Sequence, residues 1–139
     1  VTPEPGRIVT MKLGGKAVLP SPLDYLVVES PKAPLIGDAE TWQLGMQRFA
    51  ENCQFCHGAY AISSGVIPDL RWSGISANED SWAAIVRDGA LTDTGMVGFS
   101  DIIDDTEIEA IRHYVLRQAW LAVENGTADA PEVAAVGDQ

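Results

Sequence analysis

Cysteine and histidine are scarce in this chain of 139 residues, which contains two of each. A structural zinc site takes four Cys or His ligands, so it would use all of them, and His113 lies 56 positions after His57. Basic residues are also few, because nine stand against twenty acidic residues, giving a formal net charge of −11. A chain this acidic is a poor partner for nucleic acid or an anionic membrane surface.

The sequence also contains no run of 18 apolar residues and no visible signal peptide. We therefore expect no transmembrane segment. The hydrophobic content of 46% is sufficient for one buried core, and the length fits one domain with flexible ends. The chain begins at Val1 rather than at Met, so we expect a mature product or an excised fragment.

The most informative stretch is Cys53-Gln54-Phe55-Cys56-His57. Two thiols three positions apart, followed at once by an imidazole, have the spacing that attaches a c-type haem. The thiols of Cys53 and Cys56 add to the porphyrin vinyl groups, and His57 binds the iron as the proximal ligand. The motif predicts one covalent haem c with iron. It also predicts a periplasmic protein, because such haem is attached on the far side of a membrane.

Three alternatives remain for the same motif: a thioredoxin-like dithiol, a zinc site and a disulfide between Cys53 and Cys56. The dithiol motif belongs in a βαβ unit, and no buried strand is predicted before Cys53. The zinc site would require His113 in addition to the motif, and the disulfide requires nothing more.

The second axial ligand would decide what the iron does. Haem iron with His and Met ligands transfers electrons, whereas an open position binds ligands or catalyses. Met11 lies in the N-terminal segment and Met46 inside the helix predicted before the haem motif. Met96 lies between Gly95 and Gly98 in a predicted loop, where glycine lets backbone approach a flat ring. We therefore predict Met96 as the axial ligand.

Helical spacing predicts three long helices. The first begins at the N-cap Asp38 and runs to Cys53. The second begins at Ser76, which forms a capping box with Glu79, and stops at Gly89.

The third and longest helix begins at Asp104, which forms a capping box with Glu107, and ends at Asn125-Gly126. We predict an extended arm over residues 1–37, a haem domain over 38–126 and a flexible acidic tail over 127–139. Within the arm, residues 7–13 alternate as a strand would and Gly14-Gly15 indicates a turn.

From Gly45 onward the chain resembles class I c-type cytochromes. The features that carry the resemblance are Gly45 and Phe49, the haem motif, Pro68-Asp69-Leu70, Met96 and Tyr114. The resemblance implies an all-α fold of three to five helices around one haem. It also implies that Gly45 lets the first and last helices cross closely, with Phe49 and Tyr114 nearby. The carbonyl of Pro68 would accept a hydrogen bond from His57.

Three segments, 65–71, 88–91 and 95–101, resemble the C-terminal cytochrome domain of quinohaemoprotein alcohol dehydrogenases. Residues 6–17 resemble the last propeller strand and exit linker of those enzymes. In the family a β-propeller carries pyrroloquinoline quinone (PQQ) and calcium and oxidises the alcohol. The resemblance implies that this chain is an electron carrier rather than an enzyme. It would accept single electrons from a reduced PQQ dehydrogenase domain and pass them to a cytochrome, a cupredoxin, or a membrane quinone or oxidase.

Two other functions compete with this one: a free-standing soluble periplasmic cytochrome, and a haem enzyme or gas sensor with an open iron site. The haem propionates need donors, and Arg71 and Trp72 follow the Pro68 turn, so they are candidates. Their alternative roles are a surface charge for Arg71 and a core residue for Trp72. The other three tryptophans are predicted to be packing residues, and His113 is predicted to lie on a solvated helix face.

Overall fold

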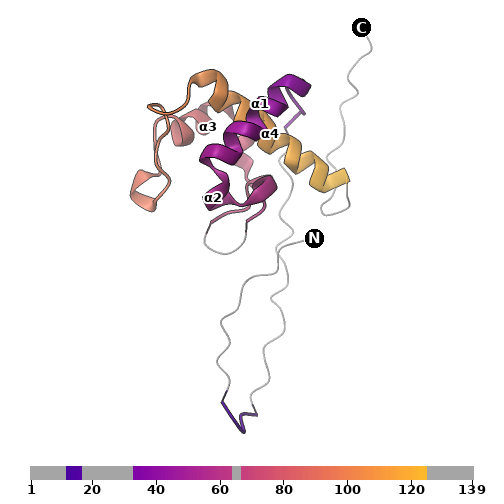
Figure 1. Ribbon diagram of the computed structural model, residues 1–139, viewed down its shortest axis with the longest axis vertical. Helices are drawn as coiled ribbons and strands as arrows, with labels where there is room; N and C mark the ends of the chain where they lie inside the picture. Colours follow the sequence, from indigo (N-terminus) through magenta and orange to yellow (C-terminus); the bar gives the residue numbers. More distant parts are fainter. Residues whose placement is uncertain (1–11, 17–32, 64–66, 125–139) are drawn as a thin grey trace.

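The computed structural model describes residues 12–16, 33–63 and 67–124, which are mostly helical, with no strand among them (Figure 1). The α-helices are α1 (Ala39–Asn52), α2 (Gln54–His57), α3 (Glu79–Val86) and α4 (Asp105–Glu124). Four short 3-10 turns connect them: η1 (Ala59–Ala61), η2 (Leu70–Trp72), η3 (Gly74–Ala77) and η4 (Thr92–Thr94). This arrangement confirms the all-α expectation. No helix of these residues is long and apolar enough to cross a membrane.

The crossing of α1 and α4 depends on a single glycine. A Cβ atom placed on Gly45 would lie 2.0 Å from the carbonyl oxygen of Ala110 and 2.9 Å from the Cβ of Tyr114. Only a residue without a side chain lets the two helices approach this closely. Next to the crossing, the rings of Phe49 and Tyr114 lie with their centroids 5.2 Å apart. The crossing predicted from the resemblance is confirmed.

Side-chain caps fix the start of α1 and of α4. The Asp38 carboxylate accepts a hydrogen bond of 2.8 Å from the backbone N–H of Thr41, as predicted. At α4, Glu107 N–H donates to Asp104 at 2.8 Å, and Asp104 N–H donates back to the Glu107 carboxylate at 3.0 Å. This reciprocal pair is the predicted capping box. Arg48 of α1 also pairs with Glu107, which joins the two helices.

The predicted start of α3 is wrong by two residues. Its N-cap is Asn78, whose side-chain oxygen accepts from Ser81 N–H at 2.8 Å. Ser76 instead lies fully buried in η3, where its hydroxyl donates to the Ser73 carbonyl at 3.1 Å. Asparagine is as strong an N-cap as serine, and the burial of Ser76 commits its hydroxyl elsewhere. The helix ends at Val86, before the predicted stop at Gly89.

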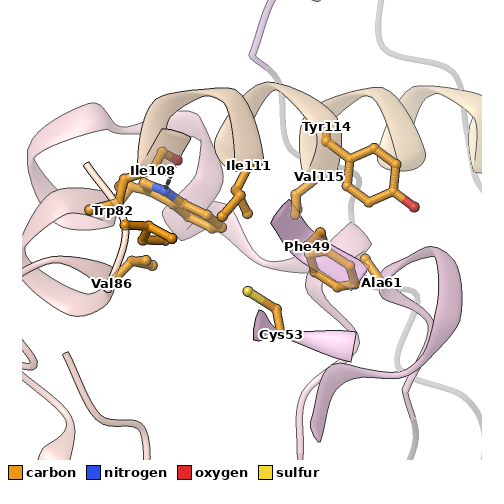
Figure 2. Packing of buried hydrophobic residues seen from close by; sticks show 10 residues of the cluster. Phe49, Cys53, Ala61, Trp82, Val86, Ile108, Ile111, Tyr114 and Val115 are labelled. Carbon is orange, nitrogen blue, oxygen red and sulfur yellow. Dashed lines mark hydrogen bonds between the residues drawn. The ribbon is translucent and has the colours of Figure 1, made fainter. Parts of the chain in front are cut away.

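One apolar cluster forms the core. Figure 2 shows Trp82 and Val86 from α3 facing Ile111 and Val115 from α4, with the Cys53 sulfur pointing toward them. The indole N–H of Trp82 donates to the Ile108 carbonyl at 3.1 Å, which satisfies its only polar atom. Other members of the cluster are Phe49, Ala61, Ile103, Ile108 and Tyr114, with Leu70, Ile85, Met96 and Phe99 packed against it.

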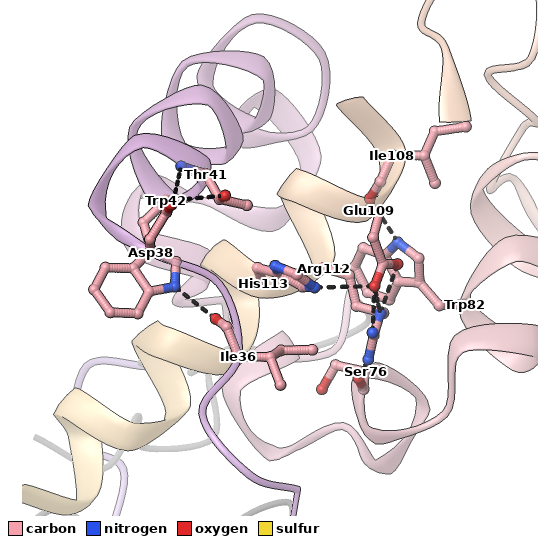
Figure 3. Close-up of polar contacts among 10 residues, drawn as sticks. All are labelled: Ile36, Asp38, Thr41, Trp42, Ser76, Trp82, Ile108, Glu109, Arg112 and His113. Carbon is pink, nitrogen blue, oxygen red and sulfur yellow. Dashed lines mark hydrogen bonds and ion pairs between the residues drawn. The ribbon is translucent and has the colours of Figure 1, made fainter. Parts of the chain in front are cut away.

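The end of the predicted arm packs against the helices. The indole N–H of Trp42 donates to the Ile36 carbonyl at 2.8 Å (Figure 3). That of Trp120 donates to the Ala33 carbonyl at 3.2 Å. The rest of the arm and the tail lie outside the described residues, except for residues 12–16. There the predicted turn is present, because Gly15 N–H donates to the Lys12 carbonyl at 2.9 Å.

His113 does not lie on a solvated face, contrary to the prediction. Its side chain is 16% exposed, and its Nε2 lies 3.0 Å from Glu109 (Figure 3). A Cβ on Gly37 would lie 2.6 Å from His113 Nδ1, so the segment before α1 covers the ring. The charged neighbours Glu109 and Arg112 suggested solvent, but Arg112 is itself buried and donates to the Ser76 carbonyl at 3.0 Å.

Candidate haem-binding site

Cys56 and His57 lie on the short helix α2, and Cys53 is the capping residue between α1 and α2. Cys53 ends α1 and precedes α2, and its carbonyl accepts from Cys56 N–H at 3.2 Å and from His57 N–H at 2.9 Å. Cys53 is buried in the apolar cluster, whereas Cys56 is exposed, and no disulfide joins them. One helical turn therefore presents two free thiols and an imidazole in the order that haem c requires.

Burial sets the chemistry of the first thiol. It raises the pKa of Cys53 to about 12, with a smaller contribution from the neighbouring Cys56. The thiol of Cys53 is therefore protonated and neutral at pH 7. Reactive dithiols of the thioredoxin kind have thiol pKa values that are lowered rather than raised. The raised pKa of Cys53 thus argues against the dithiol alternative.

His57 is half-buried, and its Nδ1 is buried without a hydrogen bond of ordinary geometry among the described residues. Burial lowers the pKa of His57, and the backbone of Pro68 opposes this with a smaller effect. Proline has no N–H, so the group that acts on the ring is the Pro68 carbonyl. A neutral imidazole with one nitrogen turned to a backbone carbonyl is the form in which histidine binds a metal.

Met96 lies in the loop that follows α3. Its N–H donates to the Leu91 carbonyl at 3.2 Å, and the two residues form an isolated antiparallel bridge. Gly95, directly before it, has a left-handed backbone with φ of +100°. The Met96 side chain packs against the same apolar cluster that contains Cys53. Met96 and Cys53 of the haem motif therefore lie at the same apolar cluster, although they are far apart in the sequence.

Two glycines close the Met96 loop. A Cβ on Gly98 would lie 2.8 Å from the Arg87 carbonyl oxygen and 2.9 Å from Gly89 N, so the two ends of the loop touch backbone to backbone. Phe99 N–H donates to the Val86 carbonyl at 2.8 Å and fixes the exit. Gly89 and Gly98 are nine positions apart in the sequence, on either side of Met96. This spacing is the sequence signal for the closure.

Arg71 is not a surface charge. It is 5% exposed and forms a bidentate pair with Asp69, with Nε–Oδ1 at 3.0 Å and Nη2–Oδ2 at 2.7 Å. Its guanidinium also stacks over the Trp72 ring, with Cζ 5.1 Å from the centroid. Trp72 is half-buried, and its indole N–H has no acceptor in the described part of the chain. The ion pair of Arg71 with Asp69 was not predicted, because the sequence does not indicate whether a charged residue in a turn is buried.

The residues present fit a covalently held haem. Cys53 belongs to the cluster, His57 is half-buried with a pKa that burial lowers, and Met96 packs against the cluster from another loop. Within the described ranges no three His, Cys, Asp or Glu side chains gather as a metal-binding group. Arg71 and Trp72 stay predictions as partners of the haem propionates.

Residues 40–115 match the family model described as cytochrome C oxidase, cbb3-type, subunit III. The chain is 40% identical over 116 residues to the dehydrogenase subunit of an alcohol dehydrogenase (quinone) from Komagataeibacter europaeus, which covers 81% of the chain and 15% of that protein. It is 37% identical over 115 residues to quinohemoprotein alcohol dehydrogenase ADH IIB from Pseudomonas putida, which covers 82% and 16%.

A solved structure of quinohemoprotein alcohol dehydrogenase ADHIIG from Pseudomonas putida HK5 is also similar. The TM-score is 0.66 at 30% identity, over 84% of this chain and 16% of that one. The chain therefore spans about 15–16% of the length of these relatives. The part that it matches is their C-terminal cytochrome domain.

Proposed function

The chain belongs to the cytochrome c family, and from this premise we propose that it relays single electrons from a reduced PQQ dehydrogenase domain to a downstream carrier. Covalently bound haem c is the cofactor of the family, and electron transfer is the activity consistent with it. The chain is homologous to electron-transfer components and is not itself catalytic. The donor, the acceptor and the periplasmic location belong to the proposal.

One observation carries the proposal: Cys53 of the haem motif and Met96 meet at the same apolar cluster. Cys53 and Cys56 would hold the haem through thioethers, and His57 and Met96 would bind its iron. The haem supplies an iron that gains and loses one electron without forming or breaking bonds to a substrate. Occupied axial positions favour electron transfer over oxygen chemistry, which argues against an enzyme or gas sensor.

The protein's own residues exclude water and fix the ligands. The Pro68 carbonyl would orient the His57 ring, and the closure of Gly89 on Gly98 would hold the Met96 sulfur in place. Cys56 is exposed and the neighbouring Phe55 is 100% exposed, so the cysteine side would leave a haem edge open to solvent. Such an edge is where electrons would enter or leave.

The relatives suggest the donor. They are named as quinone or quinohemoprotein alcohol dehydrogenases, and this chain matches only their cytochrome end. We propose that a propeller domain with PQQ supplies the electrons, either as part of the same polypeptide or as a separate protein. The next carrier would be a cytochrome, a cupredoxin, or a membrane quinone or oxidase. Reading the gene upstream of Val1 would distinguish a fused domain from a free-standing cytochrome.

The ligand assignment is tested with the haem-loaded chain, prepared in a host that matures c-type cytochromes. We expect the mass of one haem, a pigment that resists acid–acetone extraction, and no carbon monoxide binding in the ferrous form. Met96→Ala should lose the weak sulfur-to-iron band at the red end of the spectrum and bind carbon monoxide. Met46→Ala is the matched control, because Met46 lies exposed on α1. Ready carbon monoxide binding by the unmodified protein would overturn the assignment.

A further inference from the structure

The ion pair of Asp69 and Arg71 is unusual for this chain because it is buried on both sides. The two side chains are 8% and 7% exposed. Asp69 accepts three hydrogen bonds from Arg71: two from the guanidinium, at 3.0 and 2.7 Å, and one from the backbone N–H at 3.1 Å. Removing two charges from water costs several kcal/mol unless geometry and hydrogen bonds compensate, so such a pair favours one conformation strongly.

The pair lies in the turn that presents Pro68 to His57. The Pro68 carbonyl belongs to the peptide bond that leads directly into Asp69, and the proline ring fixes the φ of Pro68 itself. Asp69 has φ of −70° and ψ of +112°, and its carboxylate folds forward onto the N–H of Arg71. Between the two charged residues, Leu70 packs against the apolar cluster. The backbone on the C-terminal side of the Pro68 carbonyl is therefore held by charge and by packing.

We propose that the Asp69–Arg71 pair is a brace that positions the Pro68 carbonyl against His57, and that Arg71 acts on the iron through this turn. The inference rests on the proposed role of His57 as the proximal ligand. A carbonyl held toward the ring strengthens imidazole as a ligand. Loss of such hydrogen-bond partners typically lowers metal affinity or activity by about 10–100-fold. The Nε and Nη2 atoms of Arg71 donate to Asp69, and no described residue accepts a hydrogen bond from its Nη1. A propionate contact through Nη1 is compatible with the brace.

The same chain contains a matched control. Arg87 and Asp88 form a bidentate pair with similar distances, 2.8 and 3.0 Å, but their side chains are 42% and 53% exposed. Both pairs join an arginine to an aspartate through two hydrogen bonds, but they differ in burial and in their position in the fold. Substitutions at Asp69 and Arg71 can therefore be compared with the same substitutions at Asp88 and Arg87.

The experiment uses haem-loaded ferrous protein labelled with ¹⁵N-histidine, because only His57 and His113 give signals. The measurement is the rate at which the ring N–H proton of His57 exchanges with water. Asp69→Asn and Arg71→Gln should each speed this exchange and shift the reduction potential, because the carbonyl that protects the ring N–H is no longer held in place. Asp88→Asn and Arg87→Gln should do neither, and His113 serves as an internal reference. The double variant at Asp69 and Arg71 should have an effect smaller than the sum of the two singles, because each single already breaks the brace.

The covalent attachment should keep the haem bound even in destabilised variants. Arg71→Lys keeps the charge but loses the bidentate contact with Asp69, so it should give an intermediate exchange rate. Unchanged exchange in Asp69→Asn together with a shifted potential in Arg71→Gln would overturn the brace and leave only a propionate role for Arg71. Failure of the underlying proposal gives a different result. In that case the His57 ring signals of the unmodified protein would show no shift caused by the haem.

Discussion

Gly45 is the residue on which the fold depends most directly. Gly45→Ala would place a methyl group 2.0 Å from the Ala110 carbonyl oxygen, which is backbone and cannot move aside cheaply. We expect a loss of about 3 kcal/mol or more in the free energy of unfolding, measured by denaturant titration of the ferric protein. Gly74→Ala is the matched control, because nothing lies within 4 Å of its Cβ position. Equal stability of the two variants would contradict the crossing.

Glu109 supplies the charge that Arg112 needs. Arg112 holds the pKa of Glu109 below its ordinary value of 4.5, with a smaller contribution from His113. A carboxyl with a depressed folded pKa stabilises the fold above its unfolded pKa and loses that contribution as pH falls through the folded value. The free energy of unfolding should therefore fall more steeply below about pH 4.5 in the unmodified protein than in Glu109→Gln.

At pH 7 the same variant should be about 1 kcal/mol less stable, since Arg112 is buried and loses an ionised partner. Glu40→Gln, at an exposed position in the first turn of α1, should change stability by only a few tenths of a kcal/mol. Urea titrations between pH 3 and 7 measure both variants. A Glu109→Gln curve that parallels the unmodified protein at every pH would show that the pair adds no stability.

Among the elements, the loop that closes on Gly89 and Gly98 should matter most for the iron. Gly98→Ala would place a methyl group 2.8 Å from the Arg87 carbonyl oxygen and push the loop ends apart. We expect a weaker sulfur-to-iron band and measurable carbon monoxide binding, which the unmodified protein should lack, because Met96 is displaced from the iron more often. Absorption spectra of the haem-loaded chain test this. An unchanged band would mean that the loop ends do not set the position of Met96.

Elements with local signals were predictable from the sequence, and elements fixed by distant contacts were not. Asp38 and the Asp104–Glu107 pair predicted where their helices begin, because a capping residue lies within a few positions of the backbone that it caps. The start of α3 was misplaced because Ser76 and Asn78 both cap well, and only burial of Ser76 separates them.

The same distinction applies to the site. The haem motif and Met96 were predicted from spacing and from flanking glycines, and Cys53 and Met96 lie at the same cluster. The burial of Arg71 and of His113 could not be read in this way, because it depends on partners and covering segments elsewhere in the fold. Charged neighbours in sequence indicate solvent only when no other segment lies over them.

The charge of the whole molecule should govern how it meets its electron acceptor. The formal net charge is −11, and charges that attract across solution raise association rates in a way that salt screens. We expect electron transfer from the ferrous protein to a basic small carrier to slow as ionic strength rises, and transfer to an acidic carrier to speed up. Stopped-flow mixing at several salt concentrations measures both.

An uncharged small-molecule oxidant is the control for effects of salt on the haem itself, and its rate should stay constant. The long-range field depends on total charge, whereas the final electron transfer would, on our proposal, depend on the haem edge beside the exposed Phe55. A rate to the basic carrier that is independent of salt would mean that docking is decided by this apolar contact alone. Because Debye screening at 0.1 M reaches about 10 Å, the two contributions separate cleanly over an accessible salt range.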